Sequence, residues 1–464
     1  MKIPIVYLDI LLICYNNLRR VVIMKKILFL ILLIIPFTVK AEDITLNNKC
    51  TITVSGQIHK KIEDDSYASY LNFFKDNELK ISCEETFNNI YIMYNIKPSK
   101  GTLEYNNKSL STGLNGYLNE VIKLDGPTKE AVIKYDEDYS IAEVYILGEK
   151  IPTWVQDWQT LTKADLMLFS THADDEQLFF AGLMPTYIDK GYKIQVVYFT
   201  NHYNNTLRYH EQLEGLWTIG IKYYPVISKF PDAYSTSLEG ATNNLIAAGY
   251  TTDDALSFEV DQIRKFKPYV VVGHDEKGEY SHGQHILNTD ILKKAIYNAA
   301  DKGFQTQSNN DVWQISKLYL HLYDQNKIIL NYDIPLDLYD GKTAYQVSKE
   351  GYAKHYSQQY TWFTDWLNGP NNSFTSANQI TTYNPAHYGL YFTNVGPDVK
   401  KDNMFENVKF PISEIIFNNK TDNSIEKLKN TINGLSDKEK YMYTGIGIIF
   451  ISLIGLIIIR NRKK

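Results

Sequence analysis

Two short segments gather the residue types that hydrolytic metal sites use. Residues 170–180 read STHADDEQLFF and place one histidine next to three acids. Residues 273–285 read GHDEKGEYSHGQH and end on His282 and His285, which share one face if the turn is helical. Two imidazoles and one carboxylate are an ordinary zinc set that leaves a fourth position for water. Zinc lowers the pKa of that water to about 7, and a spare acid can then accept its proton.

Each segment alone is typical of a polar loop or a surface helix, so their places along the chain matter. The first follows the apolar run DLMLFS and the second follows YVVVG, and both runs are typical of buried strands. Strands and helices alternate from Asp165 to about residue 302. This alternation predicts an α/β fold with a Rossmann-like, mostly parallel sheet and helices on both faces. Ligands bind beyond the carboxyl ends of the strands in such sheets, and both segments begin there.

An all-β unit is expected in front of this domain. Residues 42–152 consist of short β-rich stretches separated by Asn, Gly, Pro and Asp, which is the pattern of a β-sandwich or jelly roll. The α/β domain is assigned to 153–330, and 331–420 is expected to be an extension packed on it. The elements expected in the α/β domain are strands over 165–170, 192–200, 221–227, 269–273 and 316–323, and helices over 177–191, 206–219, 252–268 and 284–302.

The motifs resemble those of the PIG-L-type de-N-acetylases, the family of N-acetylglucosaminyl-phosphatidylinositol and mycothiol-pathway deacetylases. THADDE is similar to the family's His-Pro-Asp-Asp-Glu, and SHGQH is similar to its His-Pro-Asp-His. RYHEQLEGLWTIGI, with Arg208 and Glu211, resembles its Arg-x-x-Glu helix. The resemblance covers about residues 163–300 and continues into IPLDLYDGKTA and YGLYFTNVGPD, which look like the larger secreted bacterial members, and those members tend to carry a β-sandwich in front. It implies a PIG-L deacetylase-like fold and a metal-dependent hydrolase that acts on a linear amide.

Carried over position by position, the resemblance implies metal and catalytic roles for five residues. His172, Asp175 and His285 match the metal ligands. Asp174 matches the general base. His282 matches the histidine that stabilises the oxyanion or acts as an acid. A set of two histidines and one aspartate suits Zn²⁺ and also Fe²⁺, so the sequence predicts Zn²⁺ and leaves Fe²⁺ open.

Two further positions match substrate contacts, and two depart from the family pattern. Arg208 and Asp232 match substrate-binding positions. Ala173 stands where the family has a proline, so the turn is less pre-set. Gln284 replaces the aspartate of the second motif, which removes a possible carboxylate behind the ligands. Neither change removes a ligand or the base, so we expect a competent enzyme.

Both termini predict where the protein works. From Met24 the chain reads MKKILFLILLIIPFTVKAED, which is typical of a secretory signal peptide ending near residue 41, with 1–23 as an upstream extension. Residues 441–459 carry no charge and are long enough to cross a bilayer. The basic residues at 460–464 place that end in the cytoplasm. We therefore expect an exported body anchored to the cell membrane by one helix, with 421–440 as a stalk.

Composition narrows the partners. The net charge is −5 and the body has no long basic run, so nucleic acid is not expected as a partner, because binding it needs clustered Lys and Arg. Export would leave Cys50 and Cys83 in an oxidising compartment, where they could pair. Two buried free thiols are the alternative, and the sequence does not decide between them.

Other polar and aromatic residues have plainer interpretations. Glu176 is expected to cap or orient the helix that follows it, and His355 is a candidate for the substrate cleft. Trp154 and Trp158 could stack on sugars, but they are expected to seal the contact between the two domains. The chain has no GxSxG or GxGxxG motif, and DGKTA lacks the first glycine of a phosphate loop. Surface roles are expected for three histidines: His202, His210 and His274.

The sequence therefore predicts a zinc-dependent de-N-acetylase that acts on an N-acetylated sugar in a cell-surface glycan or glycolipid. A zinc amidase acting on the peptide stems of the cell wall would use the same chemistry. The alternative from another class is a catalytically inactive surface adhesin that binds glycans through its β domain. Metal content and acetate release separate the enzyme from the adhesin.

Overall fold

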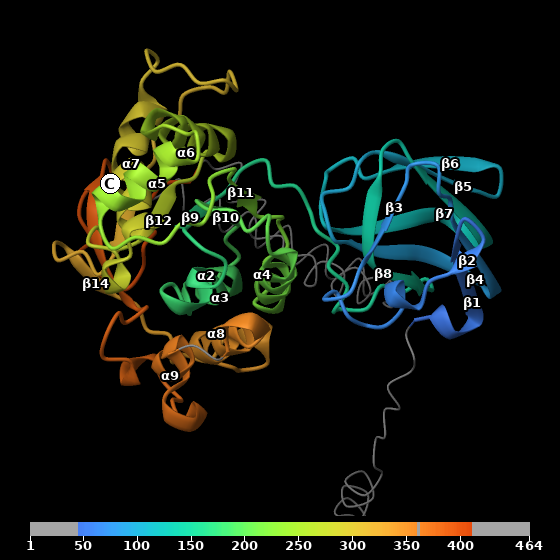
Figure 1. Cartoon of the computed structure of the whole chain (residues 1–464). Coiled ribbons are helices and arrows are strands. Elements are labelled where there is room, and N and C mark those ends of the chain that lie inside the picture. The colour runs from blue at the N-terminus through green and yellow to red at the C-terminus, as the bar shows by residue number, and fades with distance from the viewer. Residues whose placement is uncertain (1–44, 360–361, 411–464) are drawn as a thin grey trace, which may run out of the picture.

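The computed structural model describes residues 45–359 and 362–410. The expected upstream extension and signal peptide (1–41), stalk (421–440), membrane helix (441–459) and tail (460–464) lie outside the described residues. Within the described ranges, no helix is both long and apolar enough to cross a membrane. Two units lie side by side, an all-β unit and an α/β unit (Figure 1).

The all-β unit is an antiparallel sheet of eight strands in the order β2-β1-β4-β7-β5-β6, with β8 on β4 and β3 on β8. Two long strands carry it, and their pairing shifts register near Phe87. This unit matches the expected β-rich composition, while its assignment as a two-layer sandwich stays a prediction. The strands are β1 (Cys50–Val54), β2 (Gln57–Ile58), β3 (Leu71–Phe73), β4 (Leu79–Tyr94), β5 (Gly101–Tyr105), β6 (Lys108–Thr112), β7 (Asn119–Tyr135) and β8 (Tyr139–Leu147).

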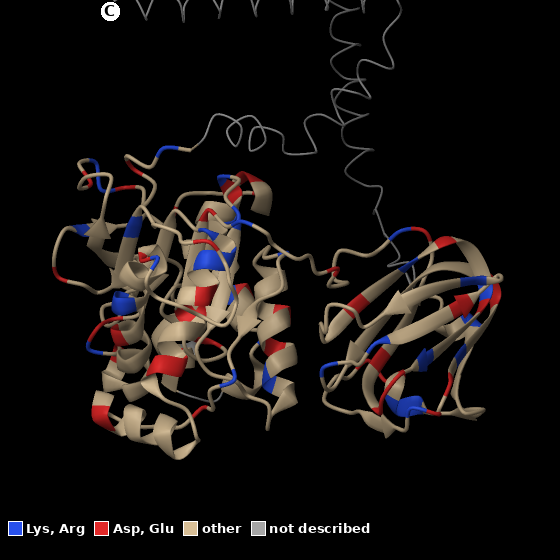
Figure 2. Ribbon diagram, turned by 90° about the horizontal axis from the view of Figure 1, so that it is seen from above, with Lys and Arg blue, Asp and Glu red and all other residues tan. Residues whose placement is uncertain are grey.

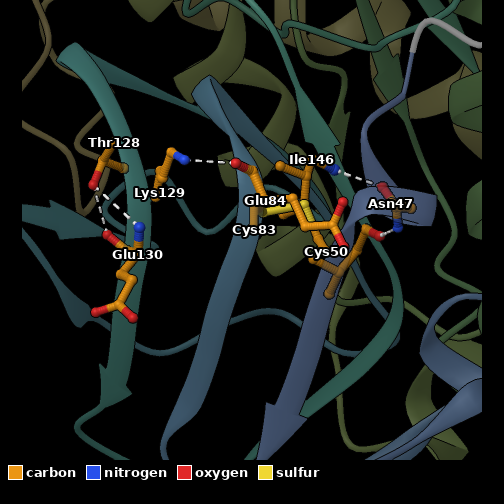
Figure 3. The surroundings of a disulfide bond; sticks show 9 residues. Asn47, Cys50, Cys83, Glu84, Thr128, Lys129, Glu130 and Ile146 are labelled. Atoms are coloured by element: carbon orange, nitrogen blue, oxygen red, sulfur yellow. Dashed lines mark hydrogen bonds between the residues drawn. A yellow bond between two sulfur atoms is a disulfide. The ribbon is translucent and has the colours of Figure 1, made fainter.

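A disulfide joins Cys50 to Cys83 inside this unit (Figure 3). The two residues face each other directly in the antiparallel register of β1 and β4, with their Cα atoms 4.0 Å apart. Beside them, Asn47 accepts the Ile146 N–H through its side-chain oxygen at 2.8 Å. The structure therefore decides for the disulfide over free thiols, and it ties the first strand of the sheet to its long central strand.

The α/β unit is built on a seven-stranded sheet in the order β11-β10-β9-β12-β13-β15-β14. The first five strands are parallel, whereas β15 and β14 add to the edge in antiparallel pairing. The mostly parallel sheet is thus present in part, and the region after residue 324 supplies its two antiparallel strands. The strands are β9 (Leu166–Ser170), β10 (Ile194–Tyr198), β11 (Val226–Ile227), β12 (Val270–Gly273), β13 (Lys317–His321), β14 (Lys327–Ile329) and β15 (His387–Thr393).

Helices cover both faces of this sheet (Figure 1). Successive strand side chains point to opposite faces, so Met167 and Val271 pack with α6 and α7, while Leu168 and Val272 pack with α2, α3 and α8. The α helices are α2 (Asp175–Leu178), α3 (Leu183–Asp189), α4 (Thr206–Thr218), α5 (Leu238–Ala247), α6 (Thr252–Phe266), α7 (Gly283–Ala300), α8 (Ala344–Tyr352) and α9 (Trp362–Asn368). The 3₁₀ turns are Asn47–Lys49, Lys60–Ile62, Glu279–Ser281, Asp337–Tyr339, Tyr356–Gln358, Pro370–Asn372 and Ala377–Gln379.

The single helix expected over 177–191 is wrong, because two short helices replace it. Gly182 separates them in the left-handed region, with φ of 89°. The Tyr332 ring lies against Gly182 so closely that a Cβ there would come within 2.5 Å of it, and the Gly182 N–H donates to Ser348 Oγ. Residues from the C-terminal region thus break the helix, and local sequence could not reveal them.

The β unit packs against the helix that follows β10. Tyr67 donates its hydroxyl hydrogen to Glu214 at 3.0 Å, and Thr206 donates to Asn95 at 2.6 Å. Trp158 is buried between the two units, with its ring 5.2 Å from that of Trp217. Trp158 therefore seals the contact, as expected, whereas Trp154 is exposed and contacts Tyr91 and Tyr145 of the β unit. Basic and acidic segments are interspersed over both units in the view of Figure 2.

Candidate metal centre and its surroundings

The two motifs meet at the point where the strand order reverses. β9 and β12 are neighbours in the sheet, but the chain leaves them toward opposite edges. This arrangement opens a crevice at the carboxyl ends of the two strands. His172 lies two residues after the end of β9, and the start of α7, with His282 as its N-cap and His285 in its first turn, comes to the same place.

Three side-chain atoms form a small triangle there: His172 Nδ1, Asp175 Oδ2 and His285 Nε2. The separations are 3.0 Å between His172 and Asp175, 3.1 Å between His285 and Asp175, and 3.2 Å between the two histidines. Tetrahedral ligands at ordinary zinc distances lie about 3.3–3.5 Å apart, so the triangle needs to open by only a few tenths of an ångström. Two imidazoles and one carboxylate also suit a divalent transition metal. The donor set and its spacing therefore fit a metal ion.

Neighbouring groups set the charge and the tautomer of these ligands. Burial lowers the pKa of His172, but the Asp175 carboxylate overrides burial and raises that pKa to about 10. The position between the His172 ring and the Asp175 carboxylate therefore favours a positive charge, either a proton or a metal ion. His172 Nε2 lies 3.1 Å from Gln284 Oε1, an acceptor, so in the neutral ring that nitrogen carries the proton and Nδ1 keeps its lone pair for the centre. Gln284 thus supports a ligand even without the carboxylate that the family pattern has there.

Asp174 lies next to the triangle in a strained backbone conformation. Its φ is +119°, which is rare for a residue with a side chain. Glu176 accepts its backbone N–H at 2.9 Å, and Arg208 lies 3.4 Å from its carboxylate. Burial raises the pKa of Asp174 to about 7, with Asp175 adding to the rise and Arg208 opposing it. A carboxylate with such a pKa is suited to exchange protons near neutral pH.

His282 presents a protonated nitrogen to the centre. Its Nδ1 accepts the backbone N–H of Gln284 at 3.3 Å, so in the neutral ring the proton lies on Nε2. Burial, with the charges of His172 and His285, lowers its pKa to about 3. The ring centroid lies 4.6 Å from that of His172 and 4.7 Å from that of His285. Of the two roles that the resemblance leaves open, this geometry suits a neutral hydrogen-bond donor to an oxyanion.

Residues 167–296 match the protein family described as PIG-L: GlcNAc-PI de-N-acetylase. The chain carries a PIG-L family domain there. Among curated relatives, 1D-myo-inositol 2-acetamido-2-deoxy-alpha-D-glucopyranoside deacetylase 1 of Frankia casuarinae is 39% identical over 67 residues, which are 14% of this chain and 22% of that protein. The enzyme of the same name from Geodermatophilus obscurus is 33% identical over 67 residues, with the same two shares. The chain thus spans about a fifth of the length of the curated relatives it matches.

Among solved structures, the N,N'-diacetylchitobiose deacetylase from Pyrococcus horikoshii is 14% identical. The match covers 54% of this chain and 89% of that chain, with a TM-score of 0.35. A likeness at this level carries no conclusion about the present chain.

The PIG-L domain holds Arg208 and Asp232 beside the centre. Arg208 donates to the Ala173 carbonyl at 2.5 Å and lies 3.8 Å from Asp232. Asp232 Oδ1 lies 3.5 Å from His172 Nε2. Burial raises the pKa of Asp232, but His172, His202 and Arg208 together hold it below its usual range. Both predicted substrate-binding residues therefore lie within reach of a ligand at the centre, and their roles stay predictions.

The surface roles expected for His202, His210 and His274 are wrong. All three are buried, and His274 is fully enclosed. His202 accepts the Ala173 N–H at 3.2 Å, a hydrogen that the usual proline lacks. His274 accepts the Thr171 N–H at 3.0 Å. A histidine that follows a strand resembles a loop residue locally, and only the fold shows that these rings are inside.

Glu176 and His355 support the motif from behind. Both side chains are buried, and His355 Nε2 lies 3.0 Å from Glu176 Oε1. Glu176 therefore orients the Asp174 turn, close to the role expected for it. His355 lies behind the turn rather than in an open cleft.

Two tyrosine rings contact His282, one exposed and one half-buried, and an exposed tryptophan lies beyond the second. Tyr234 is 68% exposed, and its ring lies 5.2 Å from that of His282 at nearly a right angle. Tyr280 lies 5.4 Å from His282 on another side, and Trp362, 53% exposed, lies 5.6 Å from Tyr280. Tyr280 and Ser281 both have positive φ, so the backbone is strained where it presents this ring. Rings that stay exposed beside a buried polar centre are suited to contact a substrate.

Proposed function

We propose that this protein is a zinc-dependent hydrolase that removes the acetyl group from an N-acetylated sugar. The observation that carries the proposal is the triangle of His172, Asp175 and His285 with Asp174 beside it. The curated relatives act, by their names, on an acetamido sugar, which supports the same substrate class here. The expected export signal and membrane helix support a glycan or glycolipid of the cell surface as the substrate.

Each step of amide hydrolysis has a group to perform it. A divalent metal held by the three ligands would polarise the amide carbonyl and lower the pKa of water. Asp174 takes a proton from the attacking water, whose oxygen forms a bond to the acetyl carbon. His282 donates its Nε2–H to the oxyanion that develops. The carbon–nitrogen bond then breaks, and the proton passes from Asp174 to the leaving amine, so the products are acetate and the free amino sugar.

The aromatic rim supports a sugar over a peptide. A pyranose ring has apolar C–H faces that pack flat against aromatic rings. Its hydroxyl groups form hydrogen bonds with charged side chains such as Arg208 and Asp232. Trp362→Ala should therefore raise KM for the glycan several-fold and leave kcat nearly unchanged. Trp154→Ala is the matched control, because Trp154 is also exposed but belongs to a cluster with Tyr91 and Tyr145 of the β unit.

The decisive experiment is acetate release by the full chain from a panel of N-acetylated glycans and acetylated peptide stems. We expect release from at least one glycan, loss of release with a chelator, and recovery when Zn²⁺ is added back. Release from peptide stems alone would favour the amidase. Glycan binding with no bound metal and no acetate release would favour the adhesin and overturn the proposal.

A further inference from the structure

Four hydrogen bonds converge on one fully buried carboxylate behind the metal centre. Glu279 lies in the 3₁₀ turn before α7 and has no exposed surface. Its Oε2 lies 2.8 Å from His274 Nδ1 and 2.7 Å from His285 Nδ1. Its Oε1 lies 2.6 Å from His321 Nδ1 and accepts the Asp275 N–H at 3.2 Å. A carboxylate offers about four acceptor positions, so this one is saturated.

The outer contacts of two of these histidines decide where their protons lie. His274 Nε2 accepts the Thr171 N–H, so the proton of the neutral ring is on Nδ1 and points at Glu279. His321 Nε2 lies 3.0 Å from the carbonyl oxygen of Asn384, so both nitrogens of that ring face acceptors. These two contacts hold the His321 ring between Glu279 and the backbone of Asn384.

The third histidine is the one that joins this network to the metal centre. With Glu279 accepting at Nδ1, the proton of neutral His285 lies on Nδ1, and the lone pair on Nε2 points at Asp175 and His172. An ionised acceptor behind a ligand also makes the imidazole more basic and fixes its plane. Gln284 has the corresponding place behind His172, but its amide oxygen is neutral. The two histidine ligands therefore have unequal support, and the ionised acceptor is behind His285.

We infer that Glu279 is a positioning residue of the centre, which holds His285 in its metal-binding tautomer without contacting the metal position or the substrate. The inference rests on the metal site of the proposed function. It assigns His274 and His321 to the same network, as the groups that hold Glu279 in place.

The test is Glu279→Gln, with Glu259→Gln as the matched control. Glu259 lies in α6, is also fully buried, and has no hydrogen-bond partner on either oxygen in the described chain. Both variants thus change one buried carboxyl to an amide, but only one change lies behind a ligand. We expect the Kd of the full chain for Zn²⁺, measured by competition with a chelating dye, to rise about 10–100-fold in Glu279→Gln and to stay at the wild-type value in Glu259→Gln. The absorption spectrum of bound Co²⁺ should change only in the first variant.

Equal Zn²⁺ affinity and equal Co²⁺ spectra in wild type and Glu279→Gln would overturn the inference. If Glu279→Gln does not fold, ¹⁵N spectra of the histidine rings in the metal-free wild-type chain provide the test, with His285 assigned by its absence in His285→Asn. A proton on Nδ1 of His285, with or without a second proton on Nε2, supports the inference, and a proton on Nε2 alone contradicts it. A wild-type chain that binds no metal and releases no acetate would overturn the proposed function, while the ¹⁵N result would still judge the hydrogen bond to Glu279.

Discussion

The α/β unit and the β unit both bury acidic side chains, but they stabilise them in different ways. In the α/β unit, Asp175 and Glu279 are surrounded by imidazoles, and both have a pKa well below the usual range although burial opposes it. In the β unit, Glu143 is 1% exposed, and the backbone N–H groups of Asp64 and Ser66 donate to it. Burial there prevails and raises the pKa of Glu143 to about 8.

The difference shows what separates a site from a structural contact. Acids that stay ionised inside a protein need several positive or polar partners, which are costly to bury and to align. The strand ends of the α/β unit supply those partners from separate segments, and the free lone pairs point at one centre. Glu143 accepts two backbone N–H groups on one oxygen, its other oxygen has no hydrogen-bond partner in the described chain, and it points to no shared centre. On this view, substitutions in the first unit should change chemistry, whereas substitutions in the second should change stability.

The largest effect is expected for Asp175→Ala. This change removes one corner of the triangle and leaves His172 and His285 without the negative charge between them. We expect metal content to fall to background and acetate release to disappear, while the circular dichroism spectrum keeps its shape. Elemental analysis of the purified chain checks the first point. Full metal content in Asp175→Ala would contradict the difference drawn between the two units, because Asp175 would then stabilise the fold and would not bind metal.

Asp174→Asn should separate the base from the ligands. The amide keeps the shape of the side chain but cannot accept a proton, so kcat should fall by about 10²–10⁴-fold with metal content unchanged. Steady-state acetate release and elemental analysis on one preparation give both values. A turnover equal to that of wild type would contradict the role of Asp174.

The double change Cys50→Ser with Cys83→Ser should affect stability alone. The disulfide closes a loop with a sequence separation of 33 residues. Chain-entropy arguments give its loss a cost of about 4 kcal/mol in the free energy of unfolding. Denaturant unfolding followed by tyrosine fluorescence would measure it, and kcat below the transition should match wild type. A fall in kcat of the folded variant would show that the β unit shapes the site.

The smallest effect is expected for Glu143→Gln, and it should depend on pH. The pKa of Glu143 is raised from the ordinary 4.5 to about 8 in the folded chain. Between pH 4.5 and pH 8, the folded chain therefore keeps a proton on Glu143 that the unfolded chain has lost. The stability that this proton supports is complete below pH 4.5 and is lost as pH rises through 8. The amide resembles the protonated acid at every pH, so the Tm of the variant should gain a few degrees on wild type between pH 5 and pH 8.5. A constant difference in Tm would rule out this titration.

Much of the α/β unit could be predicted because its signals are local. Apolar runs of strand length, Thr251 and Asp254 at the start of α6, and Pro268 after its end mark elements within a few residues. The places of the two motifs after strands also predicted that the segments would meet, and the family resemblance implied His172, Asp175 and His285 as the ligands. The network behind them was missed because Glu279 and His321 are far apart in the chain and have no shared local pattern.

By itself, the sequence placed two polar motifs after strands of one α/β domain, because a motif and an apolar run are local patterns, and the family resemblance implied which of their residues act as ligands and base. The parallel core of the sheet also followed from sequence, since apolar periodicity is a local property. Only the tertiary structure decided which histidines lie inside, where each ring carries its proton, and that Gly182 breaks a helix. Those outcomes depend on partners from other parts of the chain, such as Glu279 for His285 and Tyr332 for Gly182, and packing sets such distances where local sequence cannot.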